Sequence, residues 1–582
     1  MTGGHDDPIV LTRTNAARVG KLADAPEWAF PFPPRDGCRV TPMIEAAEMY
    51  PELERMTLAA TRSVWLAFRV FDPDTKARSA EAKAEGLADW TALISDAVRR
   101  GVEVRVLLTD FEPVMADHLH AGSWASFHRL RALADTLDEP SRDRLQLIVI
   151  QHEGEVGWAW RQMLRLPLGM KLRRMVARLA TGEEAEDGGL DSRPGLWPHT
   201  AWEGERPRGW RRGPPPRLWP ATYHQKFAVF DGQIAMIGGL DLDERRWDDR
   251  WHRQRADRTW HDISARVEGP AAGDAARHFA RLWNRELPRF RQQVAEWTSR
   301  VERQLVLDPL TELGTPELPA AIPAGTATVQ IARTLSRRSS RAFAFGPVAH
   351  IRELRAAHRL LIRSARRLLY IEAQFFRSRQ AASWVVRALR TNPDLEVIIL
   401  VANAPEEVAF EGQADNPAHR HGEWLQTRAL GRIQRVGGDR VGLFSLAKPE
   451  RVRGSEAEFD AQRGSAFGAG LIHIHAKMLL ADDATCLLSS ANINGRSFDW
   501  DTELGLIWRE SGDVLTAFRR SLWQQLLGAP QPDDAGLAAW RAVADANRQL
   551  PPEQRQGFVI PYQLVRARRF ARPYWFVPDD LV

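Results

Sequence analysis

An eight-residue pattern occurs twice in this chain, and an internal repeat constrains the fold more than any other feature of the sequence. "HQKFAVFD" spans residues 224–231 and "HAKMLLAD" spans 475–482, so both read H-x-K-x-x-x-x-D with mostly apolar residues between Lys and Asp. Each copy is followed by a turn of small residues, "GGLDL" (238–242) and "SSANI" (489–493). The repeat predicts two similar structural units.

The segments upstream of the two copies also match each other. "RSVWLAFRVF" (62–71) resembles "RRLLYIEAQFF" (366–376), and "RRGVEVRVLLTD" (99–110) resembles "NPDLEVIILVAN" (392–403). Short apolar runs that follow helical stretches predict buried strands. The fold class predicted for each unit is therefore α/β, a mixed β-sheet flanked by helices.

The predicted domain organisation follows from the repeat. A stretch rich in Pro and Gly, "DPLTELGTPELPAAIPAGT", separates the two units and is typical of a linker. We expect, in chain order, an N-terminal segment, a first domain, this linker, a second domain and a C-terminal extension: 1–40, 41–307, 308–326, 327–530 and 531–582.

The first unit carries about 42 extra residues, which fall in an insertion at about 155–220. Its helical stretch places four apolar residues on one face, Leu168, Leu172, Met175 and Leu179. Such a stripe is typical of a helix packed on its own domain. The alternative is a helix in a membrane interface, with Trp158 and Trp160 at headgroup depth and arginines on lipid phosphates.

Composition and charge bound the class of protein. The chain has 582 residues, with 80 Lys and Arg against 75 Asp and Glu, a balance that suits an acidic partner or simply a solvated surface. Cys38 and Cys486 have no metal-binding spacing. We find neither a signal peptide nor an apolar stretch of about 18 residues, so we expect a location in the cytoplasm or on the cytoplasmic face of a membrane.

Two histidines and two lysines in paired motifs fit attack on a phosphodiester: His224, Lys226, His475 and Lys477. One neutral imidazole can attack phosphorus and form a covalent phosphohistidine. The other donates a proton to the leaving alkoxide and then takes one from water or an alcohol. The two ammonium groups would hold the non-bridging oxygens, so the chemistry predicts no metal and no other cofactor.

Each histidine also needs a partner for its second ring nitrogen. Asp262 follows the first motif in "RTWHDISARV" and Glu503 follows the second in "DWDTELGLIW", so we expect each carboxylate beside the histidine of its own copy. A solvated surface acid is the alternative for either one. Asp231 and Asp482 end their motifs before a turn, and we interpret them as structural caps.

The small-residue turns differ between the copies. Asn492 could donate a hydrogen bond to a phosphate oxygen, whereas its counterpart Asp241 could not. The two halves are therefore not expected to be equivalent.

Four blocks of the chain resemble the phospholipase D superfamily, in particular the branch that includes the eukaryotic phosphatidylcholine-hydrolysing enzymes. They are the segments that begin "HQKFAVFDGQ", "TWHDISARVEGP", "LYIEAQFF" and "IHAKMLLADD", at residues 224–249, 259–284, 369–376 and 474–506. The resemblance covers most of 40–530.

The resemblance implies two α/β domains that meet across a pseudo-twofold interface to form one site. It implies that His224 is the nucleophile and His475 the acid/base. It further implies that Lys226, Lys477 and Asn492 bind phosphate. Asp262 and Glu503 would support the histidines, and Ser490 and Gly239 would contact the substrate.

Two positions depart from the family pattern. Tyr223 stands where relatives often have His, and Ser489 replaces a glycine. Neither change removes a catalytic group, so we expect activity to survive.

The function we expect is hydrolysis of a glycerophospholipid to phosphatidic acid and a headgroup alcohol. A transphosphatidylase, similar to cardiolipin or phosphatidylserine synthases, would use the same intermediate. A nuclease is a weaker alternative because such relatives are short chains with a single motif, and intact His, Lys and carboxylate pairs argue against a non-catalytic membrane scaffold. The expected partners are phospholipid and, peripherally, the membrane surface, without nucleic acid, and the expected state is a monomer.

Overall fold

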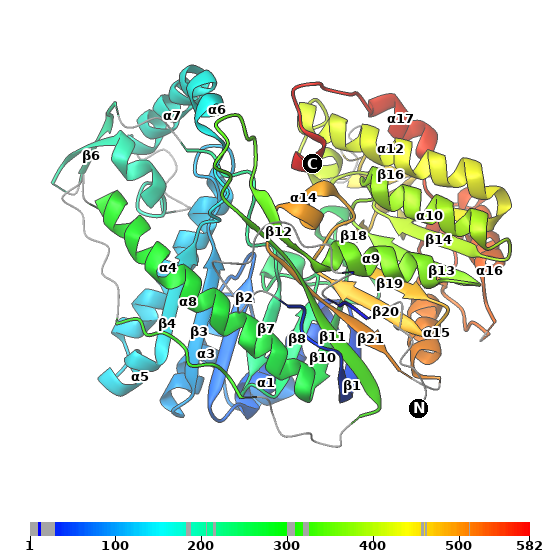
Figure 1. Ribbon diagram of the computed structural model, residues 1–582, viewed down its shortest axis with the longest axis horizontal. Helices are drawn as coiled ribbons and strands as arrows, with labels where there is room; N and C mark the ends of the chain where they lie inside the picture. Colours follow the sequence, from blue (N-terminus) through cyan, green and yellow to red (C-terminus); the bar gives the residue numbers. More distant parts are fainter. Residues whose placement is uncertain are drawn as a thin grey trace.

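The computed structural model describes residues 10–12, 15, 30–181, 188–204, 206–212, 217–298, 309–317, 325–454, 459, 463–510, 513–532 and 534–582. It is an α/β structure in which mixed β-sheet is flanked by helices (Figure 1). This is the predicted fold class.

The first half builds a seven-stranded arrangement in the order β1-β10-β8-β7-β2-β3-β4. Strands β2, β3 and β4 run parallel, and the other neighbours pair antiparallel. The bounds are β1 Arg35–Ile44, β2 Ser63–Phe68, β3 Glu103–Thr109, β4 Leu145–Ile150, β7 Phe227–Phe230, β8 Ile234–Gly238 and β10 Ile263–Glu268.

The second half repeats this arrangement strand for strand, in the order β11-β21-β20-β19-β13-β14-β15. Antiparallel pairing of β1 with β11 joins the two halves into one sheet. The bounds are β11 Ala327–Arg337, β13 Leu368–Ala373, β14 Glu396–Val401, β15 Val441–Arg451, β19 Lys477–Ala481, β20 Thr485–Ser489 and β21 Glu503–Arg509. The predicted repeat is therefore confirmed at the level of strand order and direction.

Helices cover both faces of the sheet, which is why its central strands are almost continuously apolar. The first half uses α1 Ala46–Ala59, α2 Ala80–Ala84, α3 Trp90–Arg99, α4 Asp117–Asp135, α5 Glu139–Arg144 and the long α8 Pro270–Thr298. The second uses α9 Glu353–Ser364, α10 Arg379–Thr391, α11 Glu406–Phe410, α12 Pro417–Gly437, α14 Gly495–Asp499 and α15 Val514–Leu527. None of the described helices combines the length and the apolar character needed to span a bilayer.

The domain limits stay a prediction, but two segments contribute more than their predicted role. Strand β1 begins at Arg35, inside the predicted N-terminal segment. The predicted extension 531–582 supplies α16 (Leu537–Gln549), α17 (Leu564–Phe570) and strand β22 (Val559–Pro561), which pairs with β15. Residues 308 and 318–324 of the predicted linker lie outside the described residues.

The insertion folds as α6 (Trp158–Met163), α7 (Arg165–Ala180) and a hairpin of β5 (Thr200–Glu203) and β6 (Arg206–Trp210). Residues 182–187, 205 and 213–216 of the insertion lie outside the described residues. The predicted stripe is buried in an apolar cluster with Val114 and Val156: Leu168, Leu172, Met175 and Leu179. This apolar face of α7 is therefore packed on its own domain and does not lie in a membrane interface.

The motif aspartates tie the motif strands to their neighbours. Asp231, with φ of 52°, follows β7, and its carboxylate accepts hydrogen bonds from the backbone N–H groups of residues 61–63 at 2.8–3.0 Å. Asp482, also with φ of 52°, does the same for residues 366–368 at 2.7–2.8 Å. Both aspartates thus hold a turn against the start of the neighbouring strand of the sheet, β2 or β13, as the sequence predicts.

Replacing Asp231 by Ala should lower the free energy of unfolding by about 1–3 kcal/mol. The change removes the acceptor of three backbone N–H groups. It also places alanine, whose side chain cannot form hydrogen bonds, at the unfavourable φ of 52°. Urea unfolding followed by tryptophan fluorescence measures the loss. Asp231→Asn should lose less, because it keeps one acceptor oxygen and tolerates this φ, and the exposed control Asp394→Ala should stay within about 0.5 kcal/mol of the wild type.

Candidate active site

Each motif histidine is paired with the carboxylate of the opposite half. His224 Nδ1 lies 3.0 Å from Glu503 Oε2, and His475 Nδ1 lies 2.6 Å from Asp262 Oδ2. The expectation that each carboxylate lies beside the histidine of its own copy is therefore wrong. Neither half alone contains both a motif histidine and the carboxylate that pairs with it.

Backbone hydrogen bonds across the interface explain this exchange. In the first of two backbone pairings, His224 N donates to Thr502 O at 2.8 Å and Thr502 N donates to Thr222 O at 3.0 Å. In the second, β18 (His473–Ile474) runs parallel to β9 (Trp260–His261), and His475 N donates to His261 O at 2.8 Å. Each motif thus enters the sheet beside the carboxylate segment of the other half.

The two imidazoles are only slightly exposed to solvent. The side chain of His224 is 12% exposed and that of His475 is 6% exposed, while both carboxylates are fully buried. Because Nδ1 of each ring is held by a carboxylate, Nε2 is the ring atom left for chemistry, and no described residue hydrogen-bonds to it.

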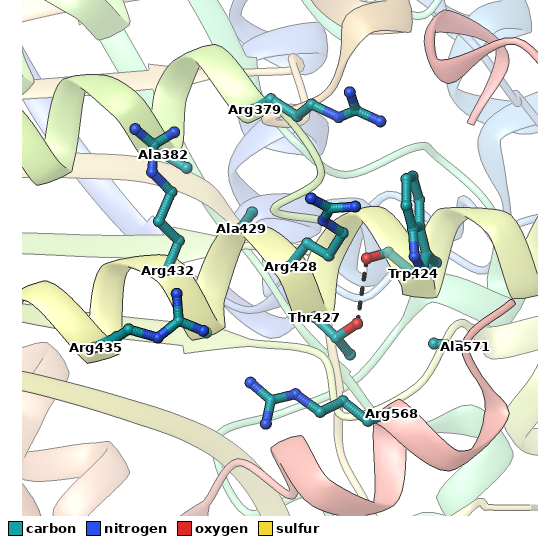
Figure 2. Close-up of a pocket in the computed structure, with 11 residues that line it drawn as sticks. Arg379, Ala382, Trp424, Thr427, Arg428, Ala429, Arg432, Arg435, Arg568 and Ala571 are labelled. Atoms are coloured by element: carbon teal, nitrogen blue, oxygen red, sulfur yellow. Dashed lines mark hydrogen bonds between the residues drawn. The ribbon is translucent and has the colours of Figure 1, made fainter. Parts of the chain in front are cut away.

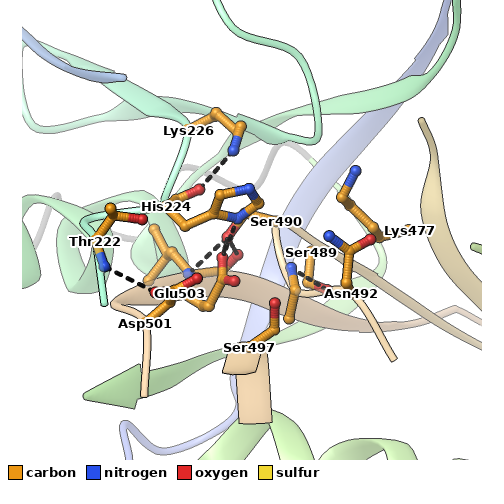
Figure 3. Close-up of polar contacts among 12 residues, drawn as sticks. Thr222, His224, Lys226, Lys477, Ser489, Ser490, Asn492, Ser497, Asp501 and Glu503 are labelled. Carbon is orange, nitrogen blue, oxygen red and sulfur yellow. Dashed lines mark hydrogen bonds and ion pairs between the residues drawn. The ribbon is translucent and has the colours of Figure 1, made fainter. Parts of the chain in front are cut away.

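The motif lysines are buried beside the histidines. Lys226 Nζ donates to the His224 carbonyl at 2.7 Å, and Lys477 Nζ donates to the His475 carbonyl and to Gln374 Oε1 at 3.3 Å. Burial lowers the pKa of Lys226 to about 8 and that of Lys477 to about 7. Figure 3 shows Lys226 and His224 on one side of the site and Lys477 on the other.

Burial also shifts the pKa of each paired histidine and carboxylate in the direction that favours its neutral form. It raises the pKa of Asp262 to about 7 and that of Glu503 to about 8. Burial and the neighbouring lysines hold the pKa of both His224 and His475 well below the ordinary histidine value. A site that is this poorly solvated favours a bound anion, because the anion would stabilise the ammonium and imidazolium forms.

Ser490 and Gly239 lie beside the carboxylates, and their predicted contact with substrate stays a prediction. Ser490 Oγ donates to Glu503 Oε2 at 2.5 Å and is fully buried (Figure 3). At the equivalent position of the first half, a Cβ on Gly239 would lie 2.3 Å from Asp262 Oδ1. The glycine therefore leaves the space that the Asp262 carboxylate occupies.

Asn492 lies at the predicted place beside Lys477. Its Nδ2 donates to Gln374 Oε1 at 3.3 Å, while its buried Oδ1 has no hydrogen-bond partner among the described residues. The counterpart Asp241 instead accepts from Val70 N at 3.0 Å. The two turns therefore place different chemistry beside the two lysines, as expected.

The sequence reasoning missed two residues that follow equivalent strands. Arg69 comes directly after β2 and Gln374 directly after β13. Gln374 contacts both Lys477 and Asn492. Arg69 lies close enough to lower the pKa of His224, and its buried Nε has no hydrogen-bond partner among the described residues. The sequence could have indicated both residues, because each follows one of two strands that the repeat aligns with each other.

The departure at Ser489 is compensated across the sheet. Ser489 pairs with Gly505 on β21, and a Cβ on Gly505 would lie 2.4 Å from the Ser489 Cβ. In the first half the residues are exchanged, because Gly238 pairs with Ser264 and a Cβ on Gly238 would lie 2.1 Å from its Oγ. Each half thus has one glycine and one serine in this cross-strand pair. The other departure, Tyr223, is buried beside the ring of His152, at 5.3 Å between centroids.

A buried ion-pair network lies directly behind Asp262. His261 contacts Glu45 Oε1 at 2.6 Å and Glu372 Oε2 at 2.9 Å, and the Asp262 N–H donates to Glu45 Oε2 at 3.2 Å. Burial opposes the charged form of His261, but Glu45 and Glu372 hold its pKa well above the ordinary value. Since Glu372 belongs to the second half, this imidazolium links both halves and positions the Asp262 backbone.

The same network contains the one group of three metal-ligating side chains found among the described residues. Its members are Glu45, His252 and His261. Both imidazoles already pair with carboxylates through their other nitrogen, His252 with Asp248 at 2.7 Å and His261 with Glu372. The histidine–carboxylate pairs of the candidate active site do not include any of the three.

A second polar feature is an arginine-lined pocket on the outer face of the second half, with a volume of about 480 Å³ (Figure 2). Five arginines from α10, α12 and α17 line it together with Trp424: Arg379, Arg428, Arg432, Arg435 and Arg568. Arg379 forms an ion pair with Asp579 at 3.1 Å, whereas no ion pair joins the other four to a carboxylate of a described residue.

Comparison with curated proteins finds relatives that share about half of this chain. Phospholipase D1 of Schizosaccharomyces pombe is 24% identical over 360 residues, which are 50% of this chain and 25% of that protein. Phospholipase D delta of Arabidopsis thaliana is 24% identical over 465 residues (59% and 53%), and human Phospholipase D1 is 27% identical over 282 residues (44% and 24%). The chain thus spans from about a quarter to about half the length of these relatives, and no family model matches it.

The solved structures that this chain matches have lower sequence identity to it. A phosphatidylserine synthase of Haemophilus influenzae Rd KW20 gives a TM-score of 0.47 at 13% identity, over 86% of this chain and 89% of that one. A phospholipase D family member from Salmonella typhimurium gives a TM-score of 0.21 at 15% identity, over 35% of this chain and 97% of that one.

The candidate site should bind an inorganic dianion more weakly as the pH rises. Lys477 and Lys226 lose their protons above pH values of about 7 and about 8, and over the same range Asp262 and Glu503 become negatively charged, so every change disfavours an anion. Calorimetric titration with tungstate, which stays dianionic, should show Kd rising at least about tenfold between about pH 6 and pH 9. The variant Lys477→Met should bind weakly with a flatter profile. A pH-independent wild-type Kd would contradict this reading of the site.

Proposed function

Because the chain is a member of the phospholipase D superfamily, we propose that it is a phosphodiesterase that hydrolyses the distal phosphodiester of glycerophospholipids to phosphatidic acid and a headgroup alcohol. One observation carries the proposal: two exchanged histidine–carboxylate pairs and two buried lysines lie close enough together to shift one another's pKa. A bound phosphodiester anion would supply the negative charge that stabilises the protonated forms of these buried basic groups.

The first step is the attack of His224 Nε2 on phosphorus. Glu503 accepts a hydrogen bond from the Nδ1–H of His224 and so keeps the attacking nitrogen unprotonated, while the low pKa of His224 favours the neutral ring. The bound phosphodiester and Asp262 stabilise the imidazolium form of His475, which therefore enters this step protonated. A P–N bond forms, the bond from phosphorus to the headgroup oxygen breaks, and this imidazolium donates its Nε2 proton to the leaving alkoxide. Lys226, Lys477 and Asn492 hold the non-bridging oxygens.

The second step returns the enzyme to its starting state. His475, now neutral, takes a proton from water, and the resulting hydroxide attacks phosphorus as the P–N bond to His224 breaks. Asp262 stabilises the imidazolium formed on His475 in each cycle, through the 2.6 Å contact with Nδ1. Phosphatidic acid leaves, and an alcohol in the place of water would give a new phosphatidyl ester.

The proposed partners are phospholipid and the surface of a membrane that contains anionic lipid. The arginine-lined pocket supports this, because four of its arginines have no carboxylate partner among the described residues. A lipid phosphate would give these arginines an anionic partner. The proposed location is therefore peripheral, on the cytoplasmic face of a membrane, with the chain as a monomer.

His224→Ala and His475→Ala should each lower headgroup release from phosphatidylcholine vesicles by at least about a thousandfold, because each removes one of the two proton-transfer or bond-forming groups. After addition of lipid at neutral pH, mass spectrometry should find no phosphatidyl group on the His224→Ala variant, because it lacks the nucleophile. The exposed control His118→Ala should keep full activity. Full turnover in either motif variant would refute the proposed chemistry.

Products formed with and without an added alcohol separate hydrolysis from transphosphatidylation. We expect phosphatidic acid alone in water and a mixture of phosphatidic acid and phosphatidylethanol when ethanol is present, because both acceptors attack the same intermediate. Mass spectrometry of the extracted lipids measures the ratio. Headgroup release that does not respond to ethanol, with no phosphatidylethanol formed, would argue against a covalent phosphohistidine open to alcohols.

A further inference from the structure

Six large apolar side chains remain exposed on the insertion and on the segments that touch it. They are between 57% and 79% exposed: Met115, Trp158, Met163, Leu166, Met170 and Phe343. Single exposed apolar residues are normal on a protein surface, but a concentration of this kind marks an interaction site.

Contacts between the elements bring these side chains onto one part of the surface. Helix α6 is bonded to the loop at residues 341–345, because Gly157 N donates to Ala344 O at 2.7 Å and Trp160 Nε1 donates to Phe343 O at 3.0 Å. Lys171 on α7 lies 3.6 Å from the sulfur of Met115. Figure 1 shows α6 and α7 together at the upper edge of the molecule, beside the loop that leads into β12 (Val348–Arg352).

Helix α7 has apolar residues on two opposite faces. The buried face, which includes Leu172 and Val176, packs on the core of the insertion. On the opposite face, Leu166 is 79% exposed and Met170 is 57% exposed, and this face continues into Arg173 and Arg174. Folding requires only the buried face. The exposed face therefore has no role that the fold explains.

The charge of α7 is entirely positive. Its sequence, RLPLGMKLRRMVARLA, contains five basic residues and no acidic one. Among the described residues, no carboxylate forms an ion pair with Arg165, Lys171, Arg173 or Arg174. Apolar side chains bordered by unpaired cations are complementary to a bilayer with anionic headgroups, where the apolar groups enter the acyl boundary and the cations meet phosphates.

We propose that these six side chains, with the basic residues of α7, form a docking surface that binds an anionic lipid bilayer. The inference rests on the proposed function, since it assigns the surface by which the enzyme reaches a membrane-bound substrate. The surface is coupled to the candidate site by the same loop. Gly346 packs so closely on Trp500 that a Cβ would lie 2.6 Å from its ring, and Trp500 stands three residues before Glu503.

The test is sedimentation of the full chain with vesicles of phosphatidylcholine, with and without phosphatidylglycerol. The double variant Leu166→Ser/Met170→Ser should bind vesicles at least about tenfold more weakly, because it removes two apolar side chains from the acyl boundary. Arg173→Gln/Arg174→Gln should lose most of the preference for phosphatidylglycerol, at about fivefold per charge. The exposed control Val514→Ser, on α15, should bind like the wild type.

A soluble phosphodiester, 4-nitrophenyl phosphocholine, separates this inference from the proposed function. The docking variants should hydrolyse it at the wild-type rate and lose activity only on vesicles. Unchanged vesicle binding by both double variants, or self-association through this surface in sedimentation velocity, would overturn the docking surface. Failure of the wild type to hydrolyse any phosphodiester while it still binds vesicles would instead overturn the proposed function.

Discussion

The exchange of carboxylates between the halves is the interaction on which the rest of the site depends. Asp262 and Glu503 are fully buried, and an unpaired buried carboxylate is costly, so each requires the histidine that only the other half supplies. The same contacts hold Nδ1 of each ring and leave Nε2 without a carboxylate partner. The packing of the two halves therefore also sets the orientation of both imidazoles.

The repeat preserves the backbone and varies the side chains. Both halves share strand order and the turn held by the motif aspartate, yet Gly239 leaves room for Asp262 where Ser490 donates to Glu503. Beside the lysines, one half presents Asp241 and the other presents Asn492. Two copies of one motif can thus perform two different roles, because small changes around each imidazole alter its hydrogen bonds.

Local features of this fold were predictable from the sequence, and long-range pairings were not. The repeat predicted the strands, and the position of Asp231 and Asp482 before a turn predicted their structural role. The partner of His475, by contrast, lies 213 residues away in the chain, and nothing in the spacing indicates that the halves exchange carboxylates. The stripe on α7 predicted its buried face, whereas an exposed apolar face lacks a comparable periodic signal because it serves no core.

The order of the chain gives the exchanged pairs a consequence for biosynthesis. The ribosome completes the first half, with His224 and Asp262, long before it reaches Glu503, which lies 279 residues beyond His224. Until then His224 has no carboxylate at its Nδ1, and Asp262 has no imidazole partner before His475 is made. A chain that ends before residue 475 would therefore lack both histidine–carboxylate pairs on which the proposed mechanism rests.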